Sequence, residues 1–398
     1  RENTRLPHAT IGLSITRKKS ARTKIKHEHL WAKSLPGRNH ALPSGASRSR
    51  LTGELRQMET KIMREASGNP AEPADFAASF VKMAEEASEN LVRARAEIGK
   101  AIFGQEKVIE QALVTVLSGG HALLVGVPGL AKTKLVETMG RVLGLDARRV
   151  QFTPDLMPSD ILGTEILDEP TPGKRAFRFV KGPVFAELLM ADEINRASPR
   201  TQSALLQAMQ EGFVTIAGQR HDLPRPFHVL ATQNPIEQEG TYPLPEAQLD
   251  RFLLEIDVDY PDRDAERRML IETTGLDAGE VKAVFTAESI LAAQRLVRRL
   301  PVGEQIVEAI LDLVRAARPL PGTPLAEKLV WGPGPRASQS LMLAIRARAL
   351  IDGRLSPSLE DVIALAEPVL KHRMALSFAA RAEGESIGDI IAGLTARF

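Results

Sequence analysis

The sequence predicts an α/β fold in which a parallel β-sheet flanked by helices is followed by a smaller all-helical domain. A short apolar run, residues 121–125, leads directly into a glycine-rich loop and a helix-like stretch, residues 134–143. A second apolar run, residues 187–193, ends in two adjacent acids, and helical apolar patterns recur over residues 276–398. Strands that alternate with helices favour a parallel sheet, because parallel neighbours are joined by helical crossovers.

Composition and periodicity divide the chain into three parts. Residues 1–73 show no sustained helical or strand periodicity and are rich in Pro, Gly, Ser and basic residues, which predicts a disordered leader. Residues 1–50 hold 12 lysines and arginines against 2 acids, whereas residues 51–398 hold 40 against 48. We expect the α/β domain over residues 74–275 and the helical domain over residues 276–398.

The basic leader is open to three interpretations. It is an arm that holds nucleic acid or another acidic surface through salt-sensitive contacts, a solvated tail, or an upstream extension outside the natural protein. It lacks the apolar core of a secretory signal. We therefore expect a cytoplasmic protein.

The rest of the composition excludes several classes of function. The chain has no cysteine, so it has no disulfides, thiolate metal sites or cysteine nucleophile. Aromatic residues make up 4%, which argues against base-stacking surfaces. No apolar run approaches the roughly 20 residues of a membrane helix, so we expect no membrane insertion.

The loop after the first strand is expected to bind phosphate groups. Helical patterns over residues 76–100 and 107–118 precede the strand, and the loop reads Gly-Val-Pro-Gly-Leu-Ala-Lys-Thr over residues 126–133. Lys132 would reach the β- and γ-phosphates of a nucleotide, and the Thr133 hydroxyl would ligate Mg²⁺. The strict motif has glycine where Ala131 stands. Alanine is compatible with a helix start there only if the backbone does not need a positive φ.

The acids Asp192 and Glu193 complete the other half of this site. They follow Lys132 by 60 and 61 positions and end an apolar strand. Acids at the carboxyl edge of a parallel strand face the crevice where such sheets bind ligands. We expect Asp192 to hold Mg²⁺ and Glu193 to polarise a water molecule against the γ-phosphate.

Three further polar residues are candidates for a hydrolysis site. Asn234 ends a strand over residues 227–233 and could orient the attacking water, although Asn-Pro is also a common turn. Arg251 directly precedes a strand over residues 252–258, where a surface salt bridge is the alternative. Arg336 lies at a helix start, an unfavourable place for a cation, which suggests a nearby anion unless the side chain is solvated.

Together these motifs resemble the AAA+ ATPases and, within them, the MoxR family, over residues 91–394. In that family Gly-x-Pro-Gly-x-Ala-Lys-Thr is the usual phosphate loop, and the run Asp-Glu-Ile-Asn-Arg-Ala at 192–197 is among the most specific stretches. The resemblance implies that Asp192 and Glu193 are the Walker B pair and Asn234 is sensor 1. It further implies that Arg251 is the arginine finger given to a neighbouring subunit's nucleotide and that Arg336 is sensor 2.

The same resemblance implies which residues surround the nucleotide. The segment at 102–106, with Gly104 and Gln105, resembles the part near adenine. The expected nucleotide-binding residues are therefore Gly104, Gln105, Gly126, Val127, Pro128, Gly129, Leu130, Ala131, Lys132, Thr133 and Asp192, with Thr133 and Asp192 as the magnesium ligands.

Two hairpin insertions are expected in the α/β domain. Residues 164–167 and 176–180 flank a Pro-Thr-Pro-Gly turn and look like the hairpin inserted in helix 2 of one AAA+ group. Residues 213–216 and 219–223, turning at Ala217-Gly218, look like the hairpin before sensor 1. Ordinary surface hairpins are the alternative. In related rings these hairpins line the pore and act on the client.

The C-terminal part fits a helical lid. Ile306, Ile310, Leu313 and Val314 form one apolar helical face, and further helical patterns cover residues 288–299, 337–351 and 359–370. By resemblance, ATP would bind between the α/β domain and this lid. His372 has no catalytic companions in the sequence, which favours a satisfied surface or lid histidine.

The resemblance implies an ATPase that uses ATP and Mg²⁺ for chaperone-like remodelling or maturation of client proteins, including metal or cofactor insertion. It implies a ring of copies of this chain, a hexamer, often with a partner that bears a von Willebrand factor A domain. Alternatives are the motor subunit of a magnesium chelatase, a DNA-acting AAA+ protein that uses the leader, and a scaffold that binds ATP without turnover. The acidic body weighs against nucleic acid, and the intact site weighs against the scaffold.

Overall fold

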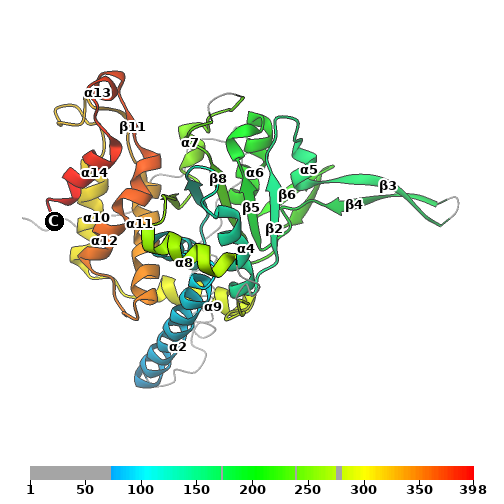
Figure 1. Cartoon of the computed structure of the whole chain (residues 1–398), viewed down its shortest axis with the longest axis horizontal. Coiled ribbons are helices and arrows are strands. Elements are labelled where there is room, and N and C mark those ends of the chain that lie inside the picture. The colour runs from blue at the N-terminus through cyan, green and yellow to red at the C-terminus, as the bar shows by residue number, and fades with distance from the viewer. Residues whose placement is uncertain (1–72, 172–173, 238–239, 275–279) are drawn as a thin grey trace, which may run out of the picture. The chain divides into compact units, whose positions relative to one another are not determined.

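Five parallel strands form the central sheet, in the order β2-β5-β8-β1-β9. Figure 1 labels β2, β5 and β8 of this sheet. The computed structural model describes residues 73–171, 174–237, 240–274 and 280–398, and Ala71–Phe398 form one unit. The strands of the sheet are β1 (Ala122–Val125), β2 (Ala147–Gln151), β5 (Leu188–Asp192), β8 (His228–Gln233) and β9 (Leu254–Asp257). The α/β prediction is confirmed, and β1, β5, β8 and β9 lie where the sequence patterns indicate.

Two predictions about chain organisation fall on undescribed segments. The basic leader, residues 1–73, lies outside the described residues except for its last residue. The expected border between residues 275 and 276 falls inside the segment 275–279, which the structure does not describe. The three-part division therefore stays a prediction. No helix within the described ranges has both the length and the apolarity needed to cross a bilayer.

The two faces of the sheet are buried in two separate hydrophobic clusters. Along β5, Leu188 and Met190 belong to one cluster, whereas Leu189 and Ala191 belong to the other. Successive strand residues point to opposite faces, so a strand covered on both sides is apolar throughout. This explains why the sequence shows an unbroken apolar run before Asp192 rather than an alternating pattern.

Helices cover both faces of this sheet. Helix α4 contacts α2 as well as β2 and β5, and α3 packs on β9. Helix α6 supplies Leu205 and Leu206 to the cluster on the opposite face. The helices of this part are α2 (Pro73–Gly99), α3 (Glu106–Leu117), α4 (Lys132–Leu143), α5 (Pro158–Leu162), α6 (Pro199–Glu211), α7 (Glu246–Leu249) and α8 (Arg263–Thr273).

The C-terminal part is a bundle of helices, as expected, with one addition. Its helices are α9 (Ala287–Arg299), α10 (Glu304–Ala316), α11 (Pro335–Ile351), α12 (Leu359–Leu370), α13 (Phe378–Ala382) and α14 (Ile387–Thr395). The addition is a small antiparallel sheet of β10 (Leu329–Trp331) and β11 (Ala375–Leu376). Strands of two and three residues are too short to produce a detectable alternation, so the sequence could not reveal them.

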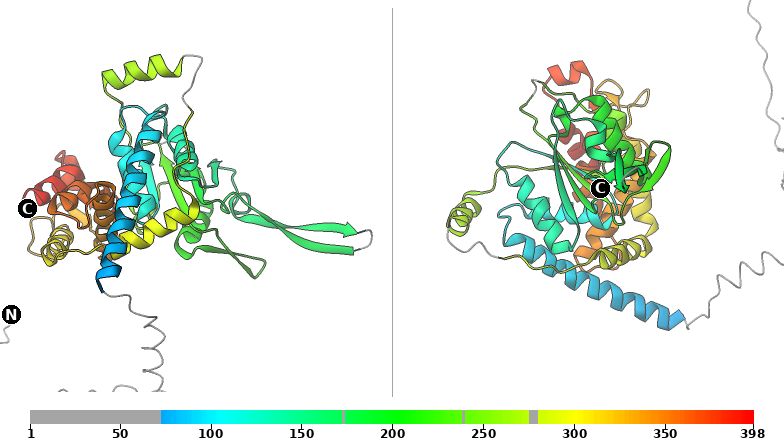
Figure 2. Two further views of the ribbon diagram at one scale, coloured as in Figure 1. Left: turned by 90° about the horizontal axis from the view of Figure 1, so that it is seen from below. Right: turned by 90° about the vertical axis from the view of Figure 1, so that its right-hand side faces the viewer.

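Both expected hairpins are present. The longer one, β3 (Gly163–Thr171) with β4 (Lys174–Lys181), projects well beyond the sheet (Figure 2). At its base Gly163 has φ +98°, and a Cβ there would lie 2.3 Å from the carbonyl oxygen of Val180, so only glycine fits. The shorter hairpin, β6 (Phe213–Ile216) with β7 (Gln219–Asp222), turns at Ala217 and Gly218 as predicted.

Candidate nucleotide site

The phosphate loop joins β1 to α4, and its lysine is held by the loop itself. Helix α4 begins at Lys132, two residues earlier than the sequence pattern indicates, so Lys132 and the partly buried Thr133 lie in its first turn. Lys132 Nζ donates to the carbonyl oxygens of Gly126 at 2.6 Å and Val127 at 2.9 Å. These bonds hold the ammonium group over the loop whose backbone N–H groups, with the positive end of α4, are suited to phosphate.

Ala131 does not meet the condition set by the sequence. It adopts a left-handed conformation with φ 56° and ψ 21°, directly before the first residue of α4. A positive φ costs a residue with a Cβ roughly 1–2 kcal/mol. The helix nevertheless starts directly after this alanine, so the loop stores backbone strain at the phosphate site.

We predict that Ala131→Gly stabilises the protein by up to about 1 kcal/mol, because relief of the left-handed strain exceeds the entropy that glycine adds to the unfolded chain. Chemical denaturation of the two purified proteins measures this difference. As a matched control, Ala392→Gly, on an exposed face of α14, should destabilise by about 1 kcal/mol. Equal losses in both variants would contradict the strain at Ala131.

The two predicted acids lie at the carboxyl end of β5. Asp192 is buried, and its Oδ1 accepts a 2.5 Å hydrogen bond from Thr232 Oγ1 on β8. Its Oδ2 accepts two bonds from Arg149 on β2, from Nη2 at 2.6 Å and from Nε at 3.1 Å. A guanidinium therefore neutralises the carboxylate that the sequence analysis expects to hold Mg²⁺.

Glu193 follows the strand in a strained conformation, with φ 55°. Its Oε2 accepts from Gln151 Nε2 at 2.6 Å and pairs with Arg196 Nη1 at 3.1 Å. Arg196 also donates from Nε to Glu237 at 3.0 Å. Both contacts are made to Oε2, so they hold the side chain of the catalytic candidate in place through one of its two oxygens.

Asn234 lies between the phosphate loop and the acids. It directly follows β8, the strand between β5 and β1, and it is 4% exposed. Its Oδ1 accepts from the backbone N–H of Ile236 at 3.2 Å. The sheet order therefore places Asn234 at the end of the strand between the one that leads into the phosphate loop and the one that ends in the two acids.

The charges of these residues affect one another. Burial lowers the pKa of Lys132, whereas the negative charges of Asp192, Glu193 and Glu237 raise it. Glu237 is therefore part of the electrostatic environment of the site, although the sequence analysis did not single it out. Arg149 and Gln151 also contact the two acids, and the sequence motifs did not mark them. The pairing of β2 with β5 could have pointed to them, because it places Gln151 opposite Asp192.

A cavity of about 500 Å³ adjoins the phosphate loop and is lined by one of the two residues expected near adenine. It is lined by Gln105, by loop residues 128–131 and by α8, among others. Gln105 is buried, its Nε2 donates to the carbonyl of Leu130 at 3.2 Å, and its Oε1 has no partner among the described residues. Gly104 has φ +66° and leaves no space for a side chain, because a Cβ would lie 2.4 Å from Ala265 on α8.

This cavity differs in one respect from the expectation that ATP binds between the α/β domain and the lid. Its lining comes from residues 101–105, 128–134 and 260–273, so none of its described lining residues belongs to the predicted helical domain. The wall opposite the loop is α8, a helix that the sequence analysis missed because only Ala265 in it is buried. Without a buried stripe, no apolar period is visible in the sequence.

The two predicted arginines lie elsewhere, in one shared cavity of about 240 Å³. Arg251 and Arg336 line it with Met209, Gln210 and Asp250. Arg336, the second residue of α11, pairs with Asp250 at 3.5 Å. The backbone N–H of Arg251 donates to the carbonyl of Gln248 at 3.2 Å, whereas its guanidinium has neither a hydrogen bond nor an ion pair with any described residue. The structure thus brings the two arginines together and separates them from the cavity at the phosphate loop.

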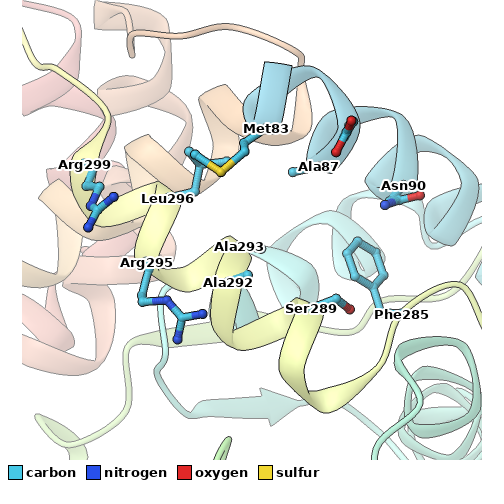
Figure 3. A pocket seen from close by; sticks show the side chains of 11 residues that line it. Met83, Ala87, Asn90, Phe285, Ser289, Ala292, Ala293, Arg295, Leu296 and Arg299 are labelled. Atoms are coloured by element: carbon cyan, nitrogen blue, oxygen red, sulfur yellow. The ribbon is translucent and has the colours of Figure 1, made fainter. Parts of the chain in front are cut away.

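Another hollow, of about 270 Å³, lies between α2 and α9 (Figure 3). Met83, Phe285 and Leu296 give it an apolar wall, and Arg295 and Arg299 lie at its edge. It shares no lining residue with the predicted site, so it takes no part in the chemistry described above.

The residues present fit a nucleotide with Mg²⁺. Thr133 offers a hydroxyl and Asp192 a carboxylate, which are the hard oxygen ligands that Mg²⁺ prefers, and phosphate oxygens and water complete such a shell. The described residues contain no cluster of three or more histidine, aspartate or glutamate side chains that could hold a metal without a nucleotide. A parallel sheet with a phosphate loop, two acids and a polar residue on the strand between them defines an AAA ATPase.

Comparison with known proteins agrees with this class. The model of the ATPase family associated with various cellular activities (AAA) matches residues 121–254, and that of the AAA lid domain matches residues 325–394. Chaperone MoxR1 of Mycobacterium tuberculosis is 44% identical over 296 residues, covering 74% of this chain and 78% of that protein. Protein MoxR of Paracoccus denitrificans is 33% identical over 304 residues, covering 71% and 88%. The chain belongs to the MoxR family, and it is an ATPase.

A solved structure supports the same assignment. A crystal structure of a Cytophaga hutchinsonii protein superimposes with a TM-score of 0.74 at 36% identity, covering 81% of this chain and 98% of that chain. The similarity therefore extends through both the sheet and the C-terminal helices. The predicted fold and family are both confirmed.

Proposed function

We propose that this ATPase couples Mg²⁺-dependent ATP hydrolysis to the remodelling of client proteins, as a chaperone that works in a ring. The observation that supports client binding most directly is the projecting β3–β4 hairpin. Four large apolar side chains are exposed on it: Ile166, Leu167, Phe177 and Val180, with Phe177 72% exposed. Exposed apolar side chains gathered on one projection indicate a protein-binding surface.

The hairpin is connected to the part of the sheet that binds nucleotide. Phe179 on β4 stacks on His221 of β7 with ring centroids 4.0 Å apart, so the two hairpins meet at their bases. The shorter hairpin follows α6, which itself follows Asp192 and Glu193 by one short helical turn, Ile194–Arg196. A change at the γ-phosphate can therefore reach both hairpins through a short, packed segment.

The roles proposed for the site follow from its geometry. Lys132 and the loop N–H groups bind the phosphates, Glu193 accepts a proton from water, and Asn234 orients that water. Thr133 and Asp192 would hold Mg²⁺, which would stabilise the negative charge that develops on the phosphate oxygens. Binding requires that Lys132 exchange its bonds to Gly126 and Val127 for bonds to phosphate, and that Arg149 leave Asp192.

Arg251 and Arg336 are proposed to act on the nucleotide of a neighbouring subunit. They line a cavity that contains two cations and one carboxylate, so it has a net positive charge, and it lies away from the phosphate loop of their own chain. This arrangement fits a head-to-tail ring in which each subunit completes the site of the next. We propose a hexamer in the cytoplasm. Insertion of a metal or cofactor into the client, and a partner with a von Willebrand factor A domain, remain proposals based on family resemblance. The name of one relative, Chaperone MoxR1, agrees with a client-directed role.

We predict that Phe177→Asp lowers the affinity for an unfolded client at least tenfold, because it places a charge in the exposed apolar surface of the hairpin. Binding of fluorescently labelled casein, as a model unfolded protein, to the ATP-bound Glu193→Gln protein measures this. Phe378→Asp is the matched control, since Phe378 on α13 is 89% exposed and lies outside the hairpin. Equal affinities for Phe177→Asp and Phe378→Asp would contradict the hairpin as the client-binding surface.

A further inference from the structure

Arg373 is a buried guanidinium that connects the C-terminal helices to the segment before β9. Its side chain is 1% exposed. Nε donates to Asp250 Oδ1 at 2.8 Å, Nη2 donates to the carbonyl of Phe252 at 2.6 Å, and Nη1 donates to the carbonyl of Leu253 at 3.2 Å. More than 115 residues separate Arg373 from these partners along the chain. One side chain thus fixes both a carboxylate and the backbone of residues 250–253.

The other contacts of Arg373 anchor it within the helices. It donates to the carbonyl of Val369 on α12 and, from Nη2, to Ser340 Oγ on α11 at 3.2 Å. Burial lowers the pKa of Arg373, and the Asp250 carboxylate opposes this shift. Arginine stays charged in such surroundings, and a buried charge is costly unless it is paired and fully hydrogen-bonded, as it is here.

The clamped segment contains Arg251, and its carboxylate is shared with Arg336. Asp250 offers Oδ1 to Arg373 and Oδ2 to Arg336, the latter at 3.5 Å. Arg251 is the next residue in the chain and lines the same cavity as Arg336. Two guanidinium groups therefore pair with the Asp250 carboxylate, and a third, that of Arg251, lines the same cavity, so the charges around it sum to a net positive value that suits a phosphate.

We propose that Arg373 is a positioning residue that sets the places of Arg251 and Arg336, so that both can meet the phosphates of one neighbouring nucleotide. An ion pair with Asp250 alone would hold one side chain, whereas the bonds to the carbonyls of Phe252 and Leu253 also fix the backbone from which Arg251 projects. Catalytic groups lose about 100-fold in rate when displaced by roughly 1 Å, so such a clamp matters for turnover. The inference rests on the proposed action of Arg251 on a neighbour.

The test compares Arg373→Lys with a matched lid variant in steady-state ATP hydrolysis and thermal unfolding of the full chain. Lysine keeps the charge but cannot form the fork of bonds. Arg354→Lys is the control, because Arg354 also forks a buried carboxylate, Asp361, at 2.7 Å from each of two nitrogens, and does not contact residues 250–253. We expect Arg373→Lys to lower kcat at least about tenfold with KM changed by less than about threefold, and Arg354→Lys to leave kcat within about twofold.

A double-mutant cycle separates positioning from simple stabilisation. If Arg373 acts through Arg251, then Arg251→Ala/Arg373→Lys has the kcat of Arg251→Ala alone, within about threefold. Fully additive losses, or equal kcat values for Arg373→Lys and Arg354→Lys, would overturn the proposal. If Arg373→Lys does not fold, Asp250→Asn gives the same cycle while keeping side-chain size. An Arg251→Ala protein with unchanged kcat would instead refute the role of Arg251 itself, which separates the two failures.

Discussion

Replacing Glu193 by glutamine is expected to leave ATP binding intact and to lower the hydrolysis rate by about 10²–10⁴-fold, the usual contribution of a general base. The amide keeps the size of the side chain but cannot accept a proton from water. It would also lose the charge that pairs with Arg196 at 3.1 Å. Phosphate release measures turnover, and binding of a fluorescent ATP analogue measures affinity.

Glu237 provides the control for this experiment. It is a second carboxylate on Arg196 and contributes to the electrostatics of Lys132, but it is not placed to activate water in the proposed mechanism. Glu237→Gln should lower the rate by less than about tenfold, since it removes a neighbouring charge rather than the proton acceptor. Normal turnover in Glu193→Gln would show that another group is the base.

Replacing Arg251 by alanine is expected to lower kcat by about 10³-fold or more, because an arginine finger typically contributes a factor of 10³–10⁵. The ATP-binding residues of the same chain are untouched by this change, so nucleotide affinity of the isolated subunit should be retained. Steady-state hydrolysis by the assembled protein measures the loss.

Mixed assemblies test whether Arg251 acts on a neighbour. Glu193→Gln subunits keep Arg251 but cannot hydrolyse, whereas Arg251→Ala subunits keep Glu193. An equal mixture should regain up to roughly a quarter of wild-type activity in a head-to-tail ring, although each variant alone is nearly inactive. Mixing Arg251→Ala with the Arg251→Ala/Glu193→Gln double variant should restore nothing. Assembled mixed rings without any recovery would exclude action between subunits.

The sequence predicts best those elements whose pattern lies within one short stretch of the chain. The phosphate loop directly follows its strand, and the two acids directly follow their own apolar run, so each pattern is readable without a fold. For Arg251 the sequence itself favours only a surface salt bridge, and for Arg336 it offers only the place at a helix start, so their roles rest on family resemblance. Their common cavity depends on α11 packing near the start of β9, which no periodicity specifies.

Other features could not be predicted, because they arise from tertiary contacts or backbone geometry. Arg373 follows His372, whose buried ring has one nitrogen within 3.1 Å of the Phe252 carbonyl and the other without a partner among the described residues. The sequence favours a surface or lid position for His372; the residue lies among the C-terminal helices and is buried rather than on the surface. The left-handed backbone at Ala131 is equally invisible, since alanine normally avoids it.

The stack of Phe179 on His221 has a consequence for exchanging parts between relatives. The ring on β4 and the ring on β7 lie 4.0 Å apart, yet they belong to hairpins that are separate in the chain. A graft of residues 163–181 alone would therefore place a foreign ring against the resident His221 and disturb the register in which the two hairpins meet. A chimera that alters client choice while keeping turnover must carry position 221 along with the longer hairpin.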